Sequence, residues 1–263
     1  MARFKLTLEY AGTRYRGWQV QKNARSVQGE IARVVRAVSG RADFELQGSG
    51  RTDAGVHALS QVAHLELETP RPAEPLRLAL NDALPSDIHV LAAQKVPRRF
   101  HARHDAVARS YLYQISRRRT ALAKPYVWWV KDALDLERMR RAAAPLMGMK
   151  DYRSFTDADP EERSTRVLVE ELRLEEHGDL ILIRIQGSHF LWKMVRRVVG
   201  VLAEAGRGAL QPADVERFLR EASAAPAQLT APPSGLFLER VFYEGDVRDW
   251  PLRPAIWVDH APR

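Results

Sequence analysis

The first ten residues, MARFKLTLEY, restrict the fold more than any other stretch of the chain. Phe4, Leu6, Leu8 and Tyr10 alternate with polar residues, which is the period of a strand with one buried face. Residues 26–40 follow with apolar side chains at helical spacing, a serine that can cap the start and a glycine that can end the helix. The chain therefore begins as strand and then amphipathic helix.

The elements after this helix complete a recognisable order. We expect strands over 44–47, 62–68 and 87–96, and a helix over 75–84 that has proline at its start. The resulting order is β-α-β-β-α-β. That order predicts a ferredoxin-like unit, in which antiparallel strands carry both helices on one face.

The second half of the chain repeats the order. The patterns predict a strand over 110–116, a helix over 135–148, a hairpin over 165–187, a helix over 190–206, an inserted helix at PADVERFLREA and a closing strand over 235–244. We therefore expect an α+β fold of two ferredoxin-like β-α-β-β-α-β halves that form a mainly antiparallel sheet. The predicted divisions are 1–105, 106–245 and a tail, 246–263, that holds Trp250 and Trp257.

Composition narrows the class of protein. The formal charge is +8, and only seven of the 41 basic residues are lysines. Arginine suits phosphate contact and base stacking, which favours a nucleic-acid partner, although a biased genome would also give an arginine-rich chain. The chain has no cysteine, which excludes disulfides and thiolate metal sites. No apolar run approaches the roughly 20 residues that span a bilayer, so we expect a cytoplasmic protein.

One acid has an unusual setting, in GSGRTDAGVHALSQVAH at residues 48–64. Asp53 follows two glycines and precedes His57, and it could be a nucleophile, a general base, a metal ligand or the cap of a helix that begins at Ala54. Local composition favours the helix cap. A metal site is less expected, because no second carboxylate lies at ligand spacing from His57. We expect His101 and His104, in FHARHD, to be structural or to face RNA.

Six blocks in the same order, from about Phe4 to about Tyr243, resemble the tRNA pseudouridine synthase A family. They are EYAGTRYRGWQVQ (9–21), SVQGEI (26–31), GSGRTDAGVHALSQVAH (48–64), LNDALPSDIHV (80–90), FHARHDAVARSYLYQI (100–115) and FLWKMVRRVVGVLAEAGRG (190–208). The resemblance implies an isomerase, a tRNA pseudouridine(38-40) synthase, with a central catalytic cleft. It also implies a cytoplasmic homodimer that acts on the anticodon stem-loop of tRNA, with no cofactor, no metal, no membrane and no other protein partner.

By this resemblance Asp53 is the catalytic aspartate. The family detaches uracil from ribose at N1, rotates it and rejoins it through C5. The carboxylate could add to C6, attack C1′ or assist elimination to a glycal, and the sequence leaves these routes open. Each route needs an ionised carboxylate, which a nearby arginine favours.

Other positions carry over in the same way. Tyr111 matches the active-site tyrosine, whose ring can stack on the flipped uracil. Arg51 and Arg196 are the arginines expected near Asp53, and the family favours Arg196 over Arg197. The basic residues expected to bind the substrate together with Arg51 and Tyr111 are Arg14, Arg16, Lys22, Arg103 and Arg109. The sequence departs from the family at Ala11, Lys150 and Tyr152.

Two rival classes of protein use the same residues differently. One is a non-catalytic RNA-binding protein, which the pairing of Asp53 with Tyr111 argues against. The other is a metal-dependent nuclease or phosphoryl hydrolase that uses Asp53 with His57, which the missing carboxylate cluster argues against. The sequence does not indicate the preferred tRNAs or the role of the tail.

Overall fold

The computed structural model describes residues 1–157 and 164–259, and the chain forms two compact units. The first unit contains residues 1–107 and 237–246, and the second contains the other residues. Within the described residues, no helix has the length and apolar character that a bilayer crossing requires.

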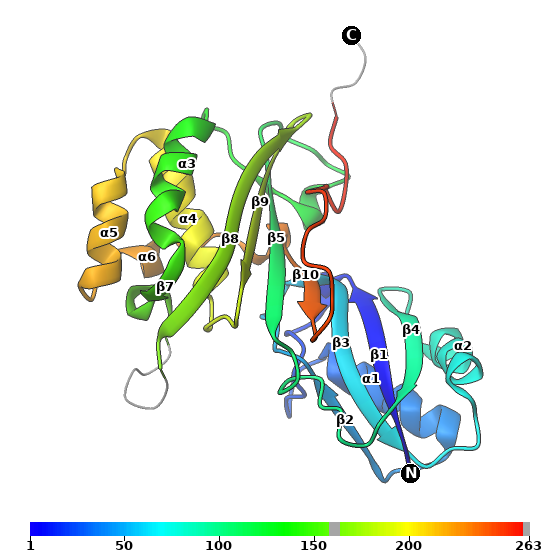
Figure 1. Cartoon of the computed structure of the whole chain (residues 1–263). Coiled ribbons are helices and arrows are strands. Elements are labelled where there is room, and N and C mark those ends of the chain that lie inside the picture. Colours follow the sequence, from blue (N-terminus) through cyan, green and yellow to red (C-terminus); the bar gives the residue numbers. More distant parts are fainter. Residues whose placement is uncertain (158–163, 260–263) are drawn as a thin grey trace. The chain divides into compact units, whose positions relative to one another are not determined.

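The first unit has the predicted element order (Figure 1). Its elements are β1 (Ala2–Tyr10), α1 (Val27–Ser39), β2 (Phe44–Gly48), β3 (His57–Leu67), α2 (Ala73–Ala83) and β4 (Ile88–Val96). The strands lie in the order β4-β1-β3-β2 with every pair antiparallel, which is the ferredoxin-like arrangement. The helices α1 and α2 contact each other.

Local signals placed β1 and α1 correctly. The predicted alternation is observed, because the four apolar side chains of β1 that we singled out are all buried. Ser26 caps α1 by accepting a hydrogen bond from the Gly29 N–H at 3.2 Å, and Gly40 ends the helix with a φ of +67°. The buried face of α1 includes Ile31 and Val34.

The long strand β3 divides one of its edges between two partners. It pairs with β1 along one edge, while the other edge pairs with β2 opposite residues 63–67 and with β10 (Leu236–Phe242) opposite His57 and Ala58. The β3–β10 pair is parallel. We expected the strand over 235–244 to close the second half, but from Phe237 onward it belongs to the first unit.

The second unit packs helices against an antiparallel sheet (Figure 1). Its elements are β5 (Ala108–Ser116), β6 (Trp128–Trp129), α3 (Leu136–Ala143), β7 (Gly148–Asp151), β8 (Arg166–His177), β9 (Leu180–Gly187), α4 (Met194–Arg207), α5 (Pro212–Arg220) and α6 (Ala225–Gln228). The strand order is β5-β9-β8-β7, and β6 adds a short parallel pair at β5.

Two helices of the second unit are shorter than predicted. The helix expected over 135–148 ends at Ala143, because Pro145 lacks an N–H and its ring disfavours a continuing helix. The helix expected over 190–206 begins at Met194. Lys193 directly before it has a φ of +61°, and among the described residues it is the one non-glycine with positive φ. That left-handed residue ends the preceding turn and starts α4.

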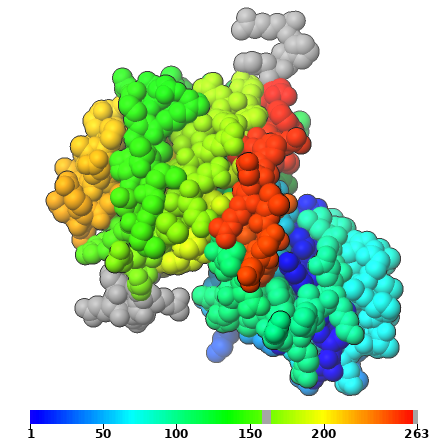
Figure 2. Space-filling view, viewed as in Figure 1, coloured from blue at the N-terminus to red at the C-terminus, as the bar shows by residue number. Residues whose placement is uncertain are grey.

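The C-terminal tail crosses the second unit, and Figure 2 shows its red atoms beside the yellow-green strands. Buried Arg184 on β9 donates to the carbonyl oxygens of Trp250 at 2.9 Å and Pro251 at 3.1 Å. Its guanidinium also lies 4.1 Å from the centre of the Trp250 ring. On β5, the Gln114 side chain accepts from the Ala255 N–H at 2.7 Å. The tail therefore satisfies polar groups that the sheet buries. Residues 260–263 of the predicted tail lie outside the described residues.

Removing residues 247–263 should destabilise the chain, because the Arg184 guanidinium loses two carbonyl acceptors and the Trp250 ring. We expect a loss of about 3 kcal/mol and a fall in Tm of about 6–12 °C by calorimetry. Adding Arg184→Leu to the truncated chain should restore part of the Tm, since leucine needs no acceptor. An unchanged Tm in the truncated chain contradicts this role of the tail.

Candidate active site

Asp53 lies in the loop that joins β2 to β3 and is partly exposed. Its carbonyl oxygen accepts from the Val56 N–H at 3.1 Å, and Gly55 has a φ of +79°. These features define a tight turn, and β3 begins at His57. No helix begins at Ala54, so the helix-cap alternative that local composition favoured for Asp53 is wrong.

The segment Tyr15–Trp18 binds this loop through backbone hydrogen bonds. Trp18 N–H donates to the Thr52 carbonyl at 3.1 Å, and Gly55 N–H donates to the Tyr15 carbonyl at 3.2 Å. Gly17 has a φ of +95°, and a Cβ there would lie 2.4 Å from the Thr52 oxygen. Glycine is therefore required for this close approach. The backbone is anchored on both sides of Asp53.

The two glycines before Arg51 serve different purposes. A Cβ on Gly48 would lie 2.6 Å from the ring of Trp18, which is itself buried. A Cβ on Gly50 would meet nothing within 4 Å. Packing against Trp18 therefore explains Gly48, whereas packing within the described residues gives no reason for glycine at position 50.

The two hydroxyls of the loop point into the protein. Ser49 donates to the Gln61 side chain at 2.7 Å, and Thr52 shares a hydrogen bond with the Tyr10 hydroxyl at 2.9 Å. Ser49 and Gln61 are both buried. Sequence reasoning did not identify Tyr10 or Gln61 as part of this setting; their alternating positions on β1 and β3 indicate inward side chains but not their partners.

The contacts of His57 indicate that its side chain supports the fold. It is buried, its Nδ1 accepts from the Gly12 N–H at 3.0 Å, and its ring stacks on Phe237 with 4.8 Å between ring centres. Within residues 1–157 and 164–259, no group of three or more histidine, aspartate and glutamate side chains could hold a metal ion. These placements do not support a nuclease that uses Asp53 with His57.

Five of the basic side chains expected to contact RNA lie in the first unit and are accessible to solvent. Arg14, Arg16, Lys22, Arg51 and Arg103 are exposed. Exposure lets each of them reach a phosphate without a desolvation cost comparable to that of a buried charge.

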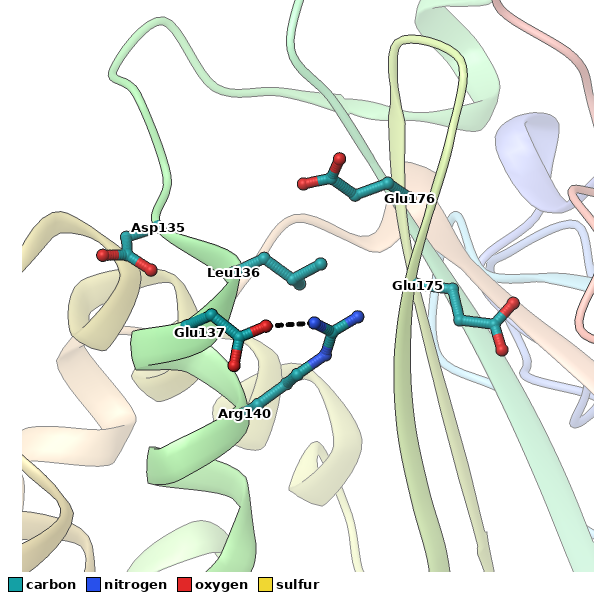
Figure 3. Close-up of a pocket in the computed structure, with 6 residues that line it drawn as sticks. All are labelled: Asp135, Leu136, Glu137, Arg140, Glu175 and Glu176. Atoms are coloured by element: carbon teal, nitrogen blue, oxygen red, sulfur yellow. Dashed lines mark hydrogen bonds and ion pairs between the residues drawn. The ribbon is translucent and has the colours of Figure 1, made fainter.

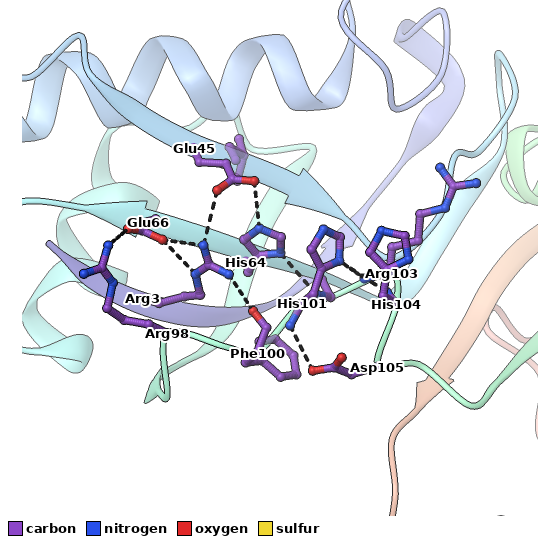
Figure 4. A network of polar contacts seen from close by, with 12 residues as sticks. Arg3, Glu45, His64, Glu66, Arg98, Phe100, His101, Arg103, His104 and Asp105 are labelled. Carbon is purple, nitrogen blue, oxygen red and sulfur yellow. Dashed lines mark hydrogen bonds and ion pairs between the residues drawn. The ribbon is translucent and has the colours of Figure 1, made fainter.

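Arg103 belongs to a polar network around residues 100–105 (Figure 4). Glu66 on β3 pairs with Arg3 and with Arg98, and the hydrogen bond from Arg3 holds the pKa of the Glu66 carboxyl below its usual value. Arg3 also donates to the Phe100 carbonyl at 2.9 Å. The ion pairs therefore attach the start of this segment to the sheet.

Two histidines of the network accept hydrogen bonds from backbone N–H groups. Nδ1 of His64 accepts from Ala102 at 3.1 Å, and Nδ1 of His101 accepts from Arg103 and His104 at 3.2 Å each. Burial lowers the pKa of His64, and burial together with the neighbouring histidines lowers that of His101. Both shifts favour the neutral imidazole. His101 and His104 contact each other and are structural in this respect.

In the second unit, Tyr111 and Tyr113 lie on β5 in different environments. Tyr111 is partly exposed, and its ring meets Phe190 edge to face with 5.1 Å between ring centres. Tyr113 is fully buried and donates to the Pro232 carbonyl at 2.8 Å. Burial raises the pKa of the Tyr113 hydroxyl. Tyr113 is thus a core residue.

Arg196 and Arg197 on α4 are equally distinct. Arg197 is buried and pairs with Asp157, whose pKa is lowered first by its hydrogen bond from Lys193 and then by Arg197. Arg196 is partly exposed, and its Nε donates to the Ala231 carbonyl at 2.7 Å. Arg197 therefore supports the structure, and Arg196 is the more accessible of the two. Arg109 is also partly exposed and donates to the Ser188 carbonyl at 3.1 Å.

The second unit also has a surface pocket of about 610 Å³, shown in Figure 3. Its lining residues are Asp135, Leu136, Glu137, Arg140, Glu175 and Glu176. Four of these are acidic and one is basic, so the pocket repels phosphates. Glu175 lies opposite Leu182 of β9, and Leu182 lies opposite Gln114, so the pocket is separated from Tyr111 along the sheet. We assign the pocket no part in tRNA binding.

Comparison with known proteins identifies the family. A family model described as tRNA pseudouridine synthase matches residues 7–105 and 142–244. Relatives named tRNA pseudouridine synthase A include those of Thermoanaerobacter sp. (strain X514), 39% identical over 92% of this chain and 100% of the relative, and Exiguobacterium sp. (strain ATCC BAA-1283 / AT1b), 42% identical over 93% and 99%. That of Agrobacterium fabrum is 40% identical over 97% of each chain.

The chain therefore belongs to the tRNA pseudouridine synthase family. The resemblance in the six sequence blocks is confirmed. Members of this family are isomerases, because uridine and pseudouridine contain the same atoms joined differently.

Gly48 and Gly50 should respond differently to alanine. Gly48→Ala forces a methyl group against the buried Trp18 ring, so we expect a loss of about 1–3 kcal/mol in the free energy of unfolding. The free energy of unfolding of Gly50→Ala should stay within about 0.5 kcal/mol of that of the wild type. Urea unfolding measures both, and equal stability of the two variants contradicts the packing explanation.

The stability of the protein should decrease at mildly acidic pH. Because the pKa values of His64 and His101 are lowered on folding, the unfolded chain binds more protons, and stability falls as pH drops below about 6.5. We expect urea midpoints to fall between pH 7.5 and 5.5. The double variant His64→Asn, His101→Asn keeps an acceptor near Nδ1 without titrating, so its midpoint should change less. An equal change of the urea midpoint in the wild type and the double variant contradicts the role given to His64 and His101.

Proposed function

We propose that this chain converts uridine to pseudouridine at positions 38, 39 and 40 of the tRNA anticodon stem-loop, with Asp53 as the catalytic carboxylate. The observation that carries the proposal is the setting of Asp53: a partly exposed acid on a loop whose backbone is anchored on both sides, within the family's sequence block. Fixed backbone geometry is what a covalent or elimination step at a single carbon requires.

The carboxylate would act on the bond between N1 and C1′ of the target uridine. It could attack C1′, add to C6 or assist formation of a glycal, and each route ends with a bond between C1′ and C5. The proton that C5 loses and the proton that N1 gains balance, so the reaction needs no cofactor, metal or ATP. We also propose roles in the reaction for Arg51 and Arg196.

Tyr111 would contact the displaced base. Its partly exposed ring offers a face on which uracil can stack, and its hydroxyl can donate or accept a proton. The buried hydroxyl of Tyr113, already bound to Pro232, is poorly suited to that role.

The basic residues would hold the tRNA backbone. Arg14, Arg16, Lys22, Arg51 and Arg103 are exposed, and Arg109 is partly exposed. Phosphate contacts would offset the few kcal/mol needed to expose the target base. The proposal includes a homodimer, with one tRNA in contact with both subunits, and a cytoplasmic location, where tRNA is available.

Asp53→Asn should abolish the reaction, because it removes the negative charge and keeps the volume. We expect pseudouridine formation in unmodified tRNA transcripts to fall by more than about 1000-fold, measured by site-resolved mapping. tRNA affinity should stay close to that of the wild type. Asp43→Asn, an equal charge change at an exposed residue of the first unit, is the matched control and should remain active.

Three results count against the proposal. Full activity of Asp53→Asn would exclude Asp53 as the catalytic carboxylate, and pseudouridine at other tRNA positions would exclude the anticodon assignment. Loss of wild-type activity on chelation would favour metal-dependent chemistry instead.

A further inference from the structure

Gln61 on β3 is fully buried and bonds to the loop that carries Asp53. Its Oε1 accepts from the Ser49 hydroxyl at 2.7 Å and from the Val62 N–H at 3.2 Å. Its Nε2 donates to the Gly50 carbonyl at 3.1 Å. One side chain thus binds two consecutive residues of the loop from inside the protein.

The orientation of the Gln61 amide is determined by these partners. The Val62 N–H can only donate, so it must face the amide oxygen. The Gly50 carbonyl can only accept, so it must face the amide nitrogen. A rotated amide would place like groups against each other at both positions, and therefore a single geometry satisfies the buried groups.

The contacts extend to the residue directly before Asp53. Nε2 of Gln61 also lies 3.5 Å from the Tyr10 hydroxyl, which shares the 2.9 Å hydrogen bond with the Thr52 hydroxyl. Thr52 is buried, and its carbonyl accepts from the Trp18 N–H. The loop is therefore held at Ser49, Gly50 and Thr52 by one connected set of side chains.

We propose that Gln61 is a positioning residue for catalysis: through Ser49, Gly50 and Tyr10 it fixes the backbone from which the Asp53 carboxylate projects. This inference rests on the proposed function of Asp53. A displacement of about 1 Å at a reacting group can cost about 100-fold in rate. A loop without regular secondary structure keeps such accuracy only when buried hydrogen bonds restrain it.

The chain supplies a matched control in the second unit. Gln114 is also fully buried, donates to the Tyr126 carbonyl at 3.1 Å and accepts from the Ala255 N–H. Gln61→Leu and Gln114→Leu each remove a buried amide with backbone partners, so both should lower stability. Gln61→Leu alone should disturb the Asp53 loop.

Single-turnover and steady-state kinetics on tRNA transcripts should separate the two variants. At a temperature where circular dichroism shows both folded, we expect Gln61→Leu to lower kcat by about 10- to 100-fold and KM to change by less than about threefold. Gln114→Leu should keep kcat within about twofold of the wild type. Equal losses in the two variants, or a kcat of Gln61→Leu near that of the wild type, overturn the proposal.

Gln61→Glu supplies a pH profile. Only its protonated carboxyl can donate to the Gly50 carbonyl, so its rate relative to the wild type should rise as pH falls from about 8 to about 6. If the ratio of the two rates stays constant and below one over this pH range, the proposed role of the hydrogen bond from residue 61 to Gly50 is wrong. If Gln61→Leu does not fold, Ser49→Ala tests the same set of hydrogen bonds, because it removes the one between Ser49 and Gln61. It should lower kcat with little change in KM.

Hydrogen exchange tests whether Gln61 holds the Asp53 loop, and this measurement does not depend on catalytic activity. Backbone amides of residues 49–56 should exchange at least about tenfold faster in Gln61→Leu than in the wild type or Gln114→Leu. If the wild type forms no pseudouridine, the proposed function fails, and exchange alone decides whether Gln61 holds the loop. Unchanged protection overturns the inference.

Discussion

The pairing of β3 is the constraint on which the first unit depends. One edge of β3 pairs with β1, while the other is divided between β2 at residues 63–67 and β10 at His57 and Ala58. The Asp53 loop leaves the sheet where β2 ends and returns where β10 begins its pairing. The Ser49 N–H continues the edge by donating to the Val62 carbonyl at 2.7 Å. The loop is therefore part of the sheet edge and is held to it.

Buried polar groups give the loop its single conformation. Apolar contacts have no preferred direction, whereas a buried amide such as Gln61 has a high cost when its partners move. Glycine at positions 17 and 48 leaves room for the Thr52 carbonyl and the Trp18 ring, which a Cβ at those positions would meet. Steric clearance and hydrogen bonding thus act together around Asp53.

On α4 and on β5 of the second unit, a buried residue lies near a partly exposed residue of the same type. Arg197 and Tyr113 face the interior, where Arg197 pairs with Asp157 and Tyr113 donates to the Pro232 carbonyl. Their neighbours Arg196 and Tyr111 remain partly exposed. A helix turns about 100° per residue, so adjacent arginines on α4 face different surroundings. On β5 the two tyrosines share a sheet face, and depth of burial separates them.

Sequence patterns predicted elements well where one signal dominated. The alternation of β1 and the serine and glycine that bound α1 are local features, so the structure reproduces them. The start of β3 was predicted too late, at residue 62 instead of His57, and this left room for a helix after Asp53 that the structure does not contain. An aspartate before small residues suits both a helix cap and a turn, and strand pairing decided between them.

The sequence by itself determined the family, the ferredoxin-like order of the first unit and the residues available for chemistry, because motifs, spacing and periodicity are properties of the chain. Only the tertiary structure decided that Ser49 and Thr52 turn inward, that His57 supports the fold, and that Arg197 pairs with Asp157. Those outcomes depend on groups distant in sequence, such as Gln61 and Tyr10. A side chain's role follows from the partners that burial brings to it, and no local pattern specifies them.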